Sequence, residues 1–339
     1  MRKILLIQLR QLGDILLTTP CIREIKRQEP NSHVAFLSHP MGKKILSQNP
    51  YVDESYYVGT ESVKEQLAIW RTIRAKKYDI VIDFMNNPRS AAITWFSAAD
   101  MRVAFSSKRF FCYNRRLPRG ENPEYIVREK FRLLEICGFA PGDVSLTLPW
   151  FETDTRPLMQ LLGGQSPFRD AAFRVVFSPT HRRANRRWPL DLYTKLADRL
   201  VEDLRAEIVW IWGPGEEEVV REAASRCRFP TIVSPATSFR EMAAIVANCD
   251  LFVGNSNGPS HVAVAVGIPS LQLHGPTDPI SWSPMTGIHD ALSSKGSPMS
   301  EISVDDVLDR LNNKMRPIVA RQRDLRKDQV RIAWNQKGR

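Results

Sequence analysis

The amino-acid sequence predicts an α/β protein of two domains, each built on a parallel sheet, with a cleft between them. The chain has 339 residues, too many for one comfortable hydrophobic core and suited to two domains of about 150 residues each. Short apolar runs alternate with helical segments in both halves, a pattern typical of parallel sheets. A stretch rich in Pro, Gly, Asp and Thr, residues 142–167, separates the halves. We therefore expect a first domain over 1–150, a linker over 151–170, a second domain over 171–315 and a basic segment over 316–339.

In the first half, apolar runs predict strands and the segments between them have helical spacing. The strands are expected over residues 3–9, 33–37, 52–57, 78–84 and 102–105. The helices are expected over residues 15–29, 41–48, 64–75, 90–99 and 128–137. Gly13 and Asp14 are expected to form the turn before the first helix. That helix contains Pro20 after two threonines, and because an internal proline removes a helical hydrogen bond, we expect a kink or an early break there.

In the second half, the same alternation resumes at Phe173. The strands are expected over residues 174–179, 207–213, 231–233, 251–254 and 268–273. The helices are expected over residues 190–204, from 216, over 239–248, from 259 or 260 to a stop at 267, and over 304–312. Proline suits the first turn of a helix, and glycine commonly ends one, which sets the two ends of the fourth of these helices.

The charge of the chain narrows the classes of partner. The formal net charge is +11, which favours an acidic partner such as nucleic acid, an anionic membrane face, or a phosphorylated or carboxylated substrate. The opening apolar run is interrupted too soon by Gln8, Arg10 and Asp14 for a signal peptide, and no stretch approaches the roughly 20 apolar residues that span a bilayer. The expectation is a soluble cytoplasmic protein whose membrane contact, if any, is peripheral.

Residues 251–279 contain the clearest candidate binding site. A buried strand ends in the polar turn 254–258, a helix opens directly after it, and the next strand also ends in a polar turn. Backbone N–H groups and a helix N-terminus at one rim form a site for an anion such as a diphosphate. His261 lies in the first turn of that helix, where it either contacts the phosphate or is a satisfied core histidine. His274 and His289 are taken as structural.

A second candidate for anion binding is the loop 178–189. It carries four arginines within six residues directly after a strand. Such a run is often a solvated loop, but here it leaves a strand end, so a clamp for an anion is at least as good an interpretation. Arginine grips phosphate in a bidentate way, and Thr180 could donate a hydroxyl hydrogen bond.

Asp14 is the sharpest single candidate of the first half. It follows Gly13 at a strand-to-helix turn, the rim where such folds place chemistry. It is either a general base or an acid that caps the helix and favours its dipole. No cluster of His, Cys and carboxylates has metal-ligand spacing, and no Asp-x-Asp occurs, so a mechanism without metal is expected.

A basic stretch with interleaved aromatic residues lies in the first half. It contains Lys108, Arg109, Arg115 and Arg116 together with Phe110, Phe111 and Tyr113. Nucleic-acid binding is one interpretation, but no helix-turn-helix, RNA-recognition or zinc signature accompanies it. The other interpretation is a site for an anionic glycolipid acceptor at a membrane surface.

Five motifs in order carry a family resemblance. They are RQLGDILLTTP (10–20), DFMNNPRSA (83–91), RRWP (186–189), GNSNGPSH (254–261) and HGPTDP (274–279). Together they resemble glycosyltransferase family 9, the ADP-heptose:lipopolysaccharide heptosyltransferases. The first motif is most similar to the third, side-branch type of core heptosyltransferase.

The resemblance implies a GT-B fold, in which two Rossmann-like domains face each other across a cleft. It implies a metal-independent, inverting transfer of heptose from ADP-heptose, without a cofactor, onto lipid A–Kdo–heptose at the inner face of the inner membrane. Asp14 falls on the family's catalytic aspartate. The implied donor-binding residues are Thr180, Arg186, Ser256, Asn257, Gly258, Ser260 and His261. The implied acceptor-binding residues are Arg89, Lys108, Arg109, Arg115 and Arg116.

Two positions depart from the family pattern. Arg186 falls where the family usually has a lysine that neutralises the leaving diphosphate, and arginine keeps that charge. Ser256 falls where the family commonly has an acid that touches the donor sugar, and a hydroxyl lacks the negative charge. One alternative is therefore the same fold with another nucleotide-sugar donor. The non-enzymatic alternative is a basic nucleic-acid-binding protein, whereas the resemblance implies no nucleic-acid partner.

Overall fold

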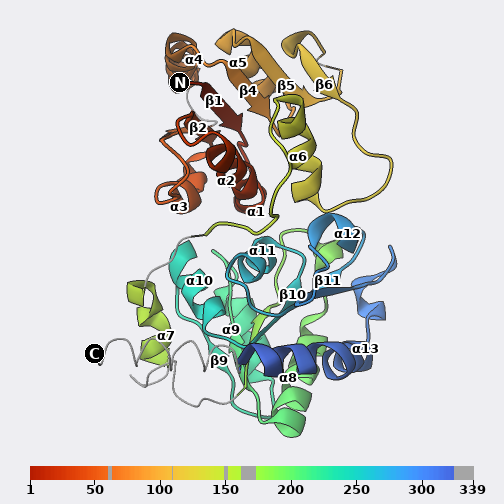
Figure 1. Ribbon diagram of the computed structural model, residues 1–339. Helices are drawn as coiled ribbons and strands as arrows, with labels where there is room; N and C mark the ends of the chain where they lie inside the picture. The colour runs from red at the N-terminus through yellow and green to blue at the C-terminus, as the bar shows by residue number, and fades with distance from the viewer. Residues whose placement is uncertain (60–62, 109, 149–151, 162–172, 324–339) are drawn as a thin grey trace, which may run out of the picture. The chain divides into compact units, whose positions relative to one another are not determined.

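The chain folds into two compact units, residues 1–149 and 150–339 (Figure 1). The computed structural model describes residues 1–59, 63–108, 110–148, 152–161 and 173–323. Arg109 and half of the expected linker, residue 151 and residues 162–170, lie outside the described residues, as do residues 324–339 of the expected basic segment. Residues 316–323 of that segment are helical.

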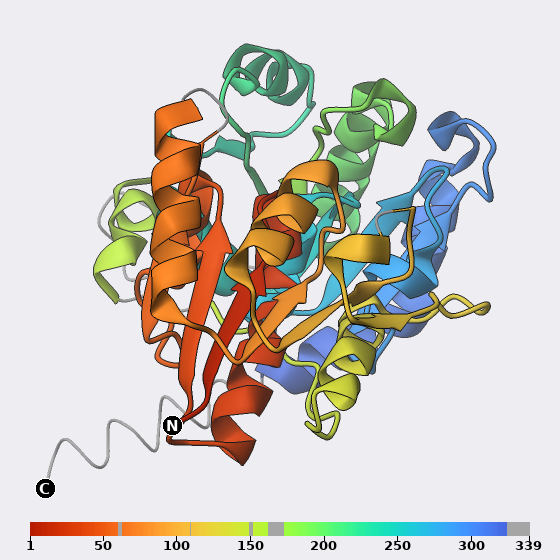
Figure 2. The ribbon, with the colours of Figure 1, turned by 90° about the horizontal axis from the view of Figure 1, so that it is seen from above.

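The first unit is a parallel sheet with helical connections; Figure 2 shows its strands, coloured red to yellow, running side by side. In its described part the strands are β1 (Lys3–Ile7), β2 (His33–Ser38), β3 (Glu54–Tyr57), β4 (Ile80–Asp83), β5 (Met101–Phe105) and β6 (Arg115–Leu117). The helices are α1 (Leu12–Leu16), α2 (Thr19–Gln28), α3 (Lys43–Leu46), α4 (Val63–Lys76), α5 (Pro88–Ser97) and α6 (Ile126–Ile136), with short 3₁₀ turns η1 (Pro40–Gly42) and η2 (Phe110–Cys112). The strand order is β3-β2-β1-β4-β5-β6.

The expected break of the first helix is confirmed. Helix α1 ends at Leu16, and α2 begins at Thr19 with Pro20 in its first turn, where the missing N–H costs no hydrogen bond. The expected turn over Gly13 and Asp14 is wrong, because the helix already begins at Leu12. Gln11 caps it, and the Asp14 side chain completes the capping box. Strand β6 was not predicted, because it is a three-residue edge strand of mainly basic residues.

The second unit repeats the architecture. In its described part the strands are β7 (Arg174–Ser178), β8 (Glu207–Trp210), β9 (Ile232–Val233), β10 (Leu251–Asn255), β11 (Ser270–His274) and β12 (His289–Ser293). The helices are α7 (Arg156–Leu161), α8 (Leu190–Leu204), α9 (Glu217–Ser225), α10 (Phe239–Ala247), α11 (Gly258–Ala265), α12 (Pro279–Trp282) and α13 (Val304–Arg310), with η3 (Glu152–Thr155), η4 (Ala184–Arg186), η5 (Met299–Glu301) and the π-helical turn η6 (Leu311–Met315). Helix α8 has the predicted bounds, whereas α11 begins one residue before the earliest predicted start.

Strand β12 was not predicted, because its sequence is polar and short. The sheet order is β12-β11-β10-β7-β8-β9, and every pair of neighbouring strands is parallel. Numbered within its own unit, each sheet therefore has the order 3-2-1-4-5-6. In this order the chain reverses direction across the sheet between β1 and β4 in the first unit, and between β7 and β10 in the second. Such a switch point leaves a crevice at the carboxyl ends of the two strands.

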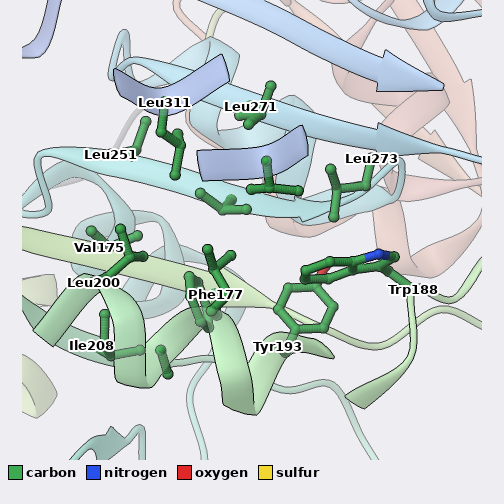
Figure 3. Packing of buried hydrophobic residues seen from close by; sticks show 14 of the residues in the cluster. Val175, Phe177, Trp188, Tyr193, Leu200, Ile208, Leu251, Leu271, Leu273 and Leu311 are labelled. Atoms are coloured by element: carbon green, nitrogen blue, oxygen red, sulfur yellow. The ribbon is translucent and has the colours of Figure 1, made fainter. Parts of the chain in front are cut away.

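Aromatic rings pack among aliphatic side chains in the core beside β7 (Figure 3). The rings of Trp188 and Tyr193 meet edge to face with centroids 4.7 Å apart, and Phe177 packs against Tyr193 at 5.4 Å. The Trp188 indole N–H also donates to the Ile302 carbonyl at 2.8 Å. The loop that precedes α8 is thereby fixed to the core at Trp188, two residues after Arg186.

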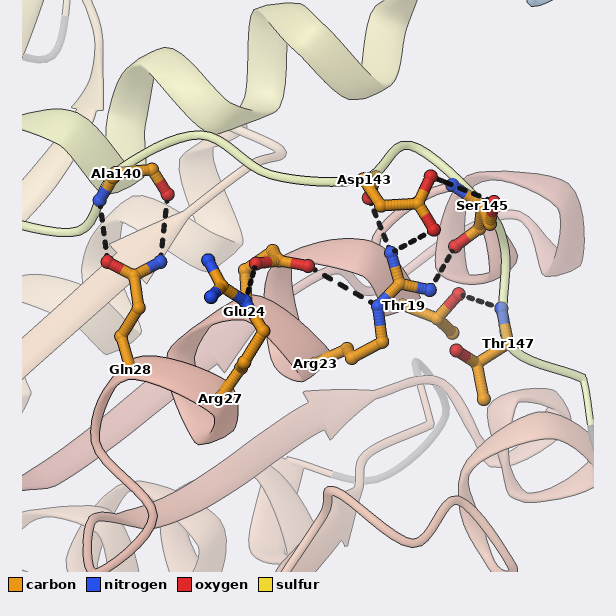
Figure 4. A network of polar contacts seen from close by, with 9 residues as sticks. All are labelled: Thr19, Arg23, Glu24, Arg27, Gln28, Ala140, Asp143, Ser145 and Thr147. Carbon is orange, nitrogen blue, oxygen red and sulfur yellow. Dashed lines mark hydrogen bonds and ion pairs between the residues drawn. The ribbon is translucent and has the colours of Figure 1, made fainter.

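The end of the first unit is anchored on α2 (Figure 4). The Arg23 guanidinium donates to the Ser145 carbonyl at 2.6 Å, and the Thr147 N–H donates to the Thr19 hydroxyl at 2.9 Å. Gln28 and Ala140 exchange two hydrogen bonds at 2.8 and 2.9 Å.

Within the described ranges, no helix is long and apolar enough to cross a membrane.

We predict that two buried histidines make the stability of the second unit depend on pH. Burial lowers the pKa of His274 and of His289 to about 4, and the charges of His261 and Arg186 add to the shift at His274. An unfolded histidine has a pKa of about 6.5, so below that pH the unfolded chain binds more protons and stability falls until the pH reaches the folded value. Between neutral pH and pH 5, each histidine should lower the free energy of unfolding by about 2 kcal/mol.

Urea unfolding near pH 7 and near pH 5 checks this. The variant His274→Gln/His289→Gln should lose less stability between the two pH values than the unaltered chain. An equal loss in both proteins would show that these histidines do not cause the dependence.

Candidate functional site

Asn255, the last residue of β10, ties together the loops at the switch point of the second unit. Its side chain is fully buried. Its Oδ1 accepts a hydrogen bond from the Trp188 N–H at 2.9 Å, and its Nδ2 donates to the Pro179 carbonyl at 2.7 Å. The loop between β7 and α8 is therefore held at two points against the end of β10.

Asn257 is the N-cap of α11 and also joins α11 to the end of β7. Its Oδ1 accepts from the Ser260 N–H at 3.2 Å, and its Nδ2 donates to Ser178 Oγ at 3.0 Å and to the Thr180 carbonyl at 2.9 Å. The buried Ser260 hydroxyl donates to the Asn257 carbonyl at 2.8 Å. Both predicted binding side chains are thus engaged inside the protein, which leaves the backbone at the start of α11 as the surface offered to a ligand.

Gly258 is the first residue of α11 and faces open space. A β-carbon built at Gly258 would meet no atom within 4 Å beyond its chain neighbours and the backbone of its own helix. The positive end of the helix dipole lies at this point, and an anion can approach the backbone without meeting a side chain. Ser256 precedes it, is half-buried, and donates its backbone N–H to the Leu273 carbonyl at 3.0 Å.

Arg186 is a positively charged residue in the loop between β7 and α8. It ends η4, and Gly275 after β11 makes room for that turn, because a β-carbon there would lie 2.8 Å from the Asn185 carbonyl oxygen. Its Nε is buried and has no hydrogen-bond partner among the described residues. Burial and then the charge of Arg183 lower the pKa of Arg186. A buried donor without an acceptor is costly, so this guanidinium is suited to an anionic ligand.

Two histidines complete the rim. His261 lies in the first turn of α11, is 5% exposed and packs near Trp282 with ring centroids 6.3 Å apart. His274 ends β11, is fully buried, and is neutral at physiological pH because its pKa is about 4. The charges of His261 and Arg186 both lower the pKa of His274 further.

Thr180 is hydrogen-bonded to Glu216. The hydroxyl donates to the Glu216 carboxylate at 2.6 Å, and the same carboxylate oxygen accepts from the Gly213 N–H at 2.9 Å. In this structure the predicted donor hydroxyl is therefore already used. Glu216, at the start of α9, is a rim carboxylate that the site prediction did not include.

Asp14 lies at the carboxyl end of β1, beside the switch point of the first unit. It is half-buried in the first turn of α1, and its carboxylate accepts a hydrogen bond from the Gln11 N–H at 3.0 Å. An acid in this turn stabilises the helix start, so the structural interpretation holds. Its place at the rim also leaves the general-base interpretation open.

Arg89 lies on the same rim as Asp14. Strand β4 ends at the fully buried Asp83, whose carboxylate accepts from the Met85 and Asn86 N–H groups at 2.9 and 3.1 Å and from the Tyr113 hydroxyl at 2.7 Å. Burial raises the pKa of Asp83. The turn that it fixes leads into α5, where the Arg89 guanidinium donates to the Val58 and Gly59 carbonyls. Burial and then the charge of Arg10 lower the pKa of Arg89.

The other predicted acceptor residues lie elsewhere. Arg115 and Arg116 are exposed on β6, the edge strand three positions from β1, a separation of about 14 Å. Lys108 is exposed in the loop before β6, and Arg109 lies outside the described residues. Tyr113 is buried and bonded to Asp83, so it belongs to the fold and not to a stacking surface. In the described parts of the chain, no group of three or more His, Cys, Asp and Glu could hold a metal ion.

Comparison with known proteins places this architecture. Residues 66–311 match glycosyltransferase family 9 (heptosyltransferase). Lipopolysaccharide heptosyltransferase 3 of Escherichia coli (strain K12) is 27% identical over 295 residues, which cover 82% of this chain and 84% of that protein.

Two solved structures share the fold. The family 9 glycosyl transferase from Veillonella parvula DSM 2008 superposes with a TM-score of 0.81 at 22% identity, covering 93% of this chain and 97% of that one. The E. coli heptosyltransferase WaaC with ADP superposes with a TM-score of 0.74 at 21% identity, covering 92% and 99%. Two Rossmann-like units in one chain are the expected GT-B fold. Because the family match spans more than half of its length, the chain belongs to glycosyltransferase family 9 and is a glycosyltransferase.

Proposed function

We propose that this glycosyltransferase moves heptose from ADP-heptose to the inner core of lipopolysaccharide, with lipid A–Kdo–heptose as acceptor. The names of its relatives support the sugar and the pathway, since lipopolysaccharide heptosyltransferase 3 is among them. A fold neighbour has been solved with ADP, which supports the nucleotide. Membership in an enzyme family replaces the non-enzymatic, nucleic-acid-binding alternative.

The observation that carries the proposal is the rim of the second unit. Helix α11 begins at Gly258 with open space around it, and the buried Nε of Arg186 has no acceptor among the described residues. Both residues follow the central strands at the switch point of the sheet. Loss of ADP builds negative charge on the β-phosphate as the glycosidic bond breaks. Donors already in place at that oxygen stabilise the transition state more than the ground state.

Asp14 is the proposed general base. The acceptor hydroxyl gives its proton to the Asp14 carboxylate while its oxygen attacks the anomeric carbon of the donor. The bond from that carbon to the β-phosphate oxygen breaks, and its electron pair leaves with ADP. A single displacement inverts the anomeric centre, and the cations of the second unit take the place of a metal. The family match begins at residue 66, so the role of Asp14 rests on its motif and on its place at the first rim.

Asp14→Asn should lower kcat by about 10²- to 10⁴-fold and leave ADP binding unchanged, because the amide cannot accept the proton. The measurement is ADP release from ADP-heptose with a deep-rough acceptor. Asp100→Asn, which alters an exposed acid on the same unit, is the matched control and should keep full activity. Full activity of the Asp14 variant would remove the base from the mechanism.

The alternative that remains is another nucleotide-sugar donor, because Ser256 stands where the family commonly has an acid. We expect calorimetric titration of ADP-, UDP- and GDP-sugars to give the tightest binding for ADP-heptose. Arg186→Gln should weaken ADP binding by roughly 10- to 100-fold through loss of a charge-assisted hydrogen bond, and Arg186→Lys should recover part of it. Arg182→Gln, on the exposed side of the same loop, is the control. Preference for a UDP- or GDP-sugar would replace the proposed donor and keep the fold.

We place the enzyme peripherally on the inner face of the inner membrane, where its acceptor lies. The supporting surface is an exposed basic and aromatic area on the first unit: Arg115 and Arg116 on β6, Phe111 at 66% exposure on η2, and Trp95 at 57% on the adjoining α5. Cationic and aromatic side chains together suit an anionic interface.

Arg115→Glu/Arg116→Glu should weaken sedimentation with phosphatidylglycerol vesicles by at least roughly 10-fold, since each basic residue contributes about 1 kcal/mol. Arg221→Glu/Arg226→Glu on the second unit is the control, and neutral phosphatidylcholine vesicles should bind neither protein. Equal sedimentation of both variants would contradict this membrane surface.

A further inference from the structure

Lys130 is a buried ammonium beneath the β1–α1 loop. It lies on α6 and is 3% exposed, whereas Arg128 and Arg132 of the same helix are exposed and half-buried. Lysine is almost never fully buried unless its charge is answered. Its surroundings must therefore account for an ammonium group at this position.

Each of the three N–H bonds of this ammonium has an acceptor. Its Nζ lies 2.6 Å from Thr18 Oγ1, 3.1 Å from Gln8 Oε1 and 3.3 Å from the Asp14 carbonyl oxygen. The Thr18 hydroxyl in turn donates to the same Asp14 carbonyl at 2.7 Å. An ammonium has three donors and no acceptor, so this arrangement satisfies the charged form in full.

The acceptors come from separate segments of the rim. Gln8 follows β1, Asp14 belongs to α1, and Thr18 lies in the break before α2. The ring of Phe84, directly after β4, lies 5.0 Å from Nζ and adds a cation–π contact. One side chain of α6 thus joins the ends of both central strands to α1, the helix that carries Asp14.

The charges around Lys130 oppose the effect of its burial. Burial lowers the pKa of Lys130, and the Asp14 carboxylate is the strongest of the charges that raise it. Cys21 contributes little charge near neutral pH, because burial raises the pKa of its thiol to about 12. The Asp14 carboxylate is therefore the main negative charge that favours this ammonium. The Asp14 carbonyl accepts one of its hydrogen bonds.

Helix α1 needs such support. It has five residues, and a helix of that length is not stable by itself. The direction in which the Asp14 carboxylate points depends on what holds these residues from outside.

We propose that Lys130 is the positioning residue of the Asp14 site, fixing the Asp14 peptide against α6 so that the carboxylate faces the acceptor hydroxyl. The inference rests on the proposed role of Asp14 as the base. Displacing a reacting group by about 1 Å can cost on the order of 10²-fold in rate, so the positioning has a measurable consequence.

A purely structural role makes the opposite prediction. Replacing a buried charge with an apolar side chain of similar volume is often neutral or stabilising when the charge serves only the fold. In that case Lys130→Met would leave kcat unchanged. Positioning instead requires kcat to fall, because methionine cannot hold the Asp14 carbonyl.

The test measures kcat, donor KM and ADP affinity of full-length Lys130→Met. We expect kcat to fall at least roughly 10-fold, with donor KM and ADP affinity unchanged, since the donor-binding rim belongs to the other unit. Lys26→Met is the matched control: it removes a lysine that pairs with Asp53 at 2.6 Å in the same unit, and should leave kcat unchanged. Thr18→Val removes one acceptor without removing the charge and should lower kcat in the same direction by less; it also serves as the test if Lys130→Met does not fold.

A double-mutant cycle with Asp14→Asn shows through which residue Lys130 acts. In the Asp14→Asn background, Lys130→Met should cause no further loss of kcat, because there is no base left to position. A loss in the Asp14→Asn background as large as in the unaltered enzyme would overturn the inference, and so would wild-type kcat in both Lys130→Met and Thr18→Val. In either case, a strong effect of Asp14→Asn would still support the proposed function. Full activity of Asp14→Asn would instead count against the proposed function.

Discussion

The strand order 3-2-1-4-5-6, present in both sheets, is the constraint on which the candidate sites depend. It makes the loops after the two central strands diverge, and it leaves the carboxyl ends of those strands uncovered. The fourth strand of each unit ends in a fully buried polar residue, Asp83 on β4 and Asn255 on β10. Asp83 binds backbone N–H groups and the Tyr113 hydroxyl, and Asn255 binds a backbone N–H and a carbonyl. In each unit this residue fixes the loops at the point where the topology opens a crevice.

The two rims differ in charge. In the first unit the rim carries the Asp14 carboxylate, the proposed base, and the buried ammonium of Lys130 donates to the Asp14 carbonyl. In the second unit the start of α11 and Arg186 are both electropositive. His274 beside them is neutral, because burial and its positive neighbours hold its pKa near 4. The proposed division of labour, base in one unit and diphosphate in the other, follows this difference.

Much of this was accessible from sequence, and the exceptions have physical causes. Apolar runs located the central strands, and Pro20 located the helix break, because both signals are local. Strands β6 and β12 were missed, because edge strands as short and polar as these have no apolar run. The four arginines of the loop 178–189 indicated an anion site. The hydrogen bond from Thr180 to Glu216 joins residues 36 positions apart, so it depends on the fold and could not be predicted from local sequence. Lys130 lies 116 residues from Asp14, and on a helix a lysine normally indicates a solvated face.

The proposed donor site divides into parts that respond differently to sequence change. Its phosphate part consists of a helix start whose cap, Asn257, is tied by three hydrogen bonds to β7, its loop and α11. Replacing such a residue disturbs the scaffold, so this part is constrained by folding as well as by binding. Ser256, half-buried next to the cap, is tied by a backbone hydrogen bond, which leaves the identity of its side chain open to change. In the proposed site, recognition of the diphosphate would be built into the fold, whereas the choice of sugar would rest on a position that can vary without disturbing it.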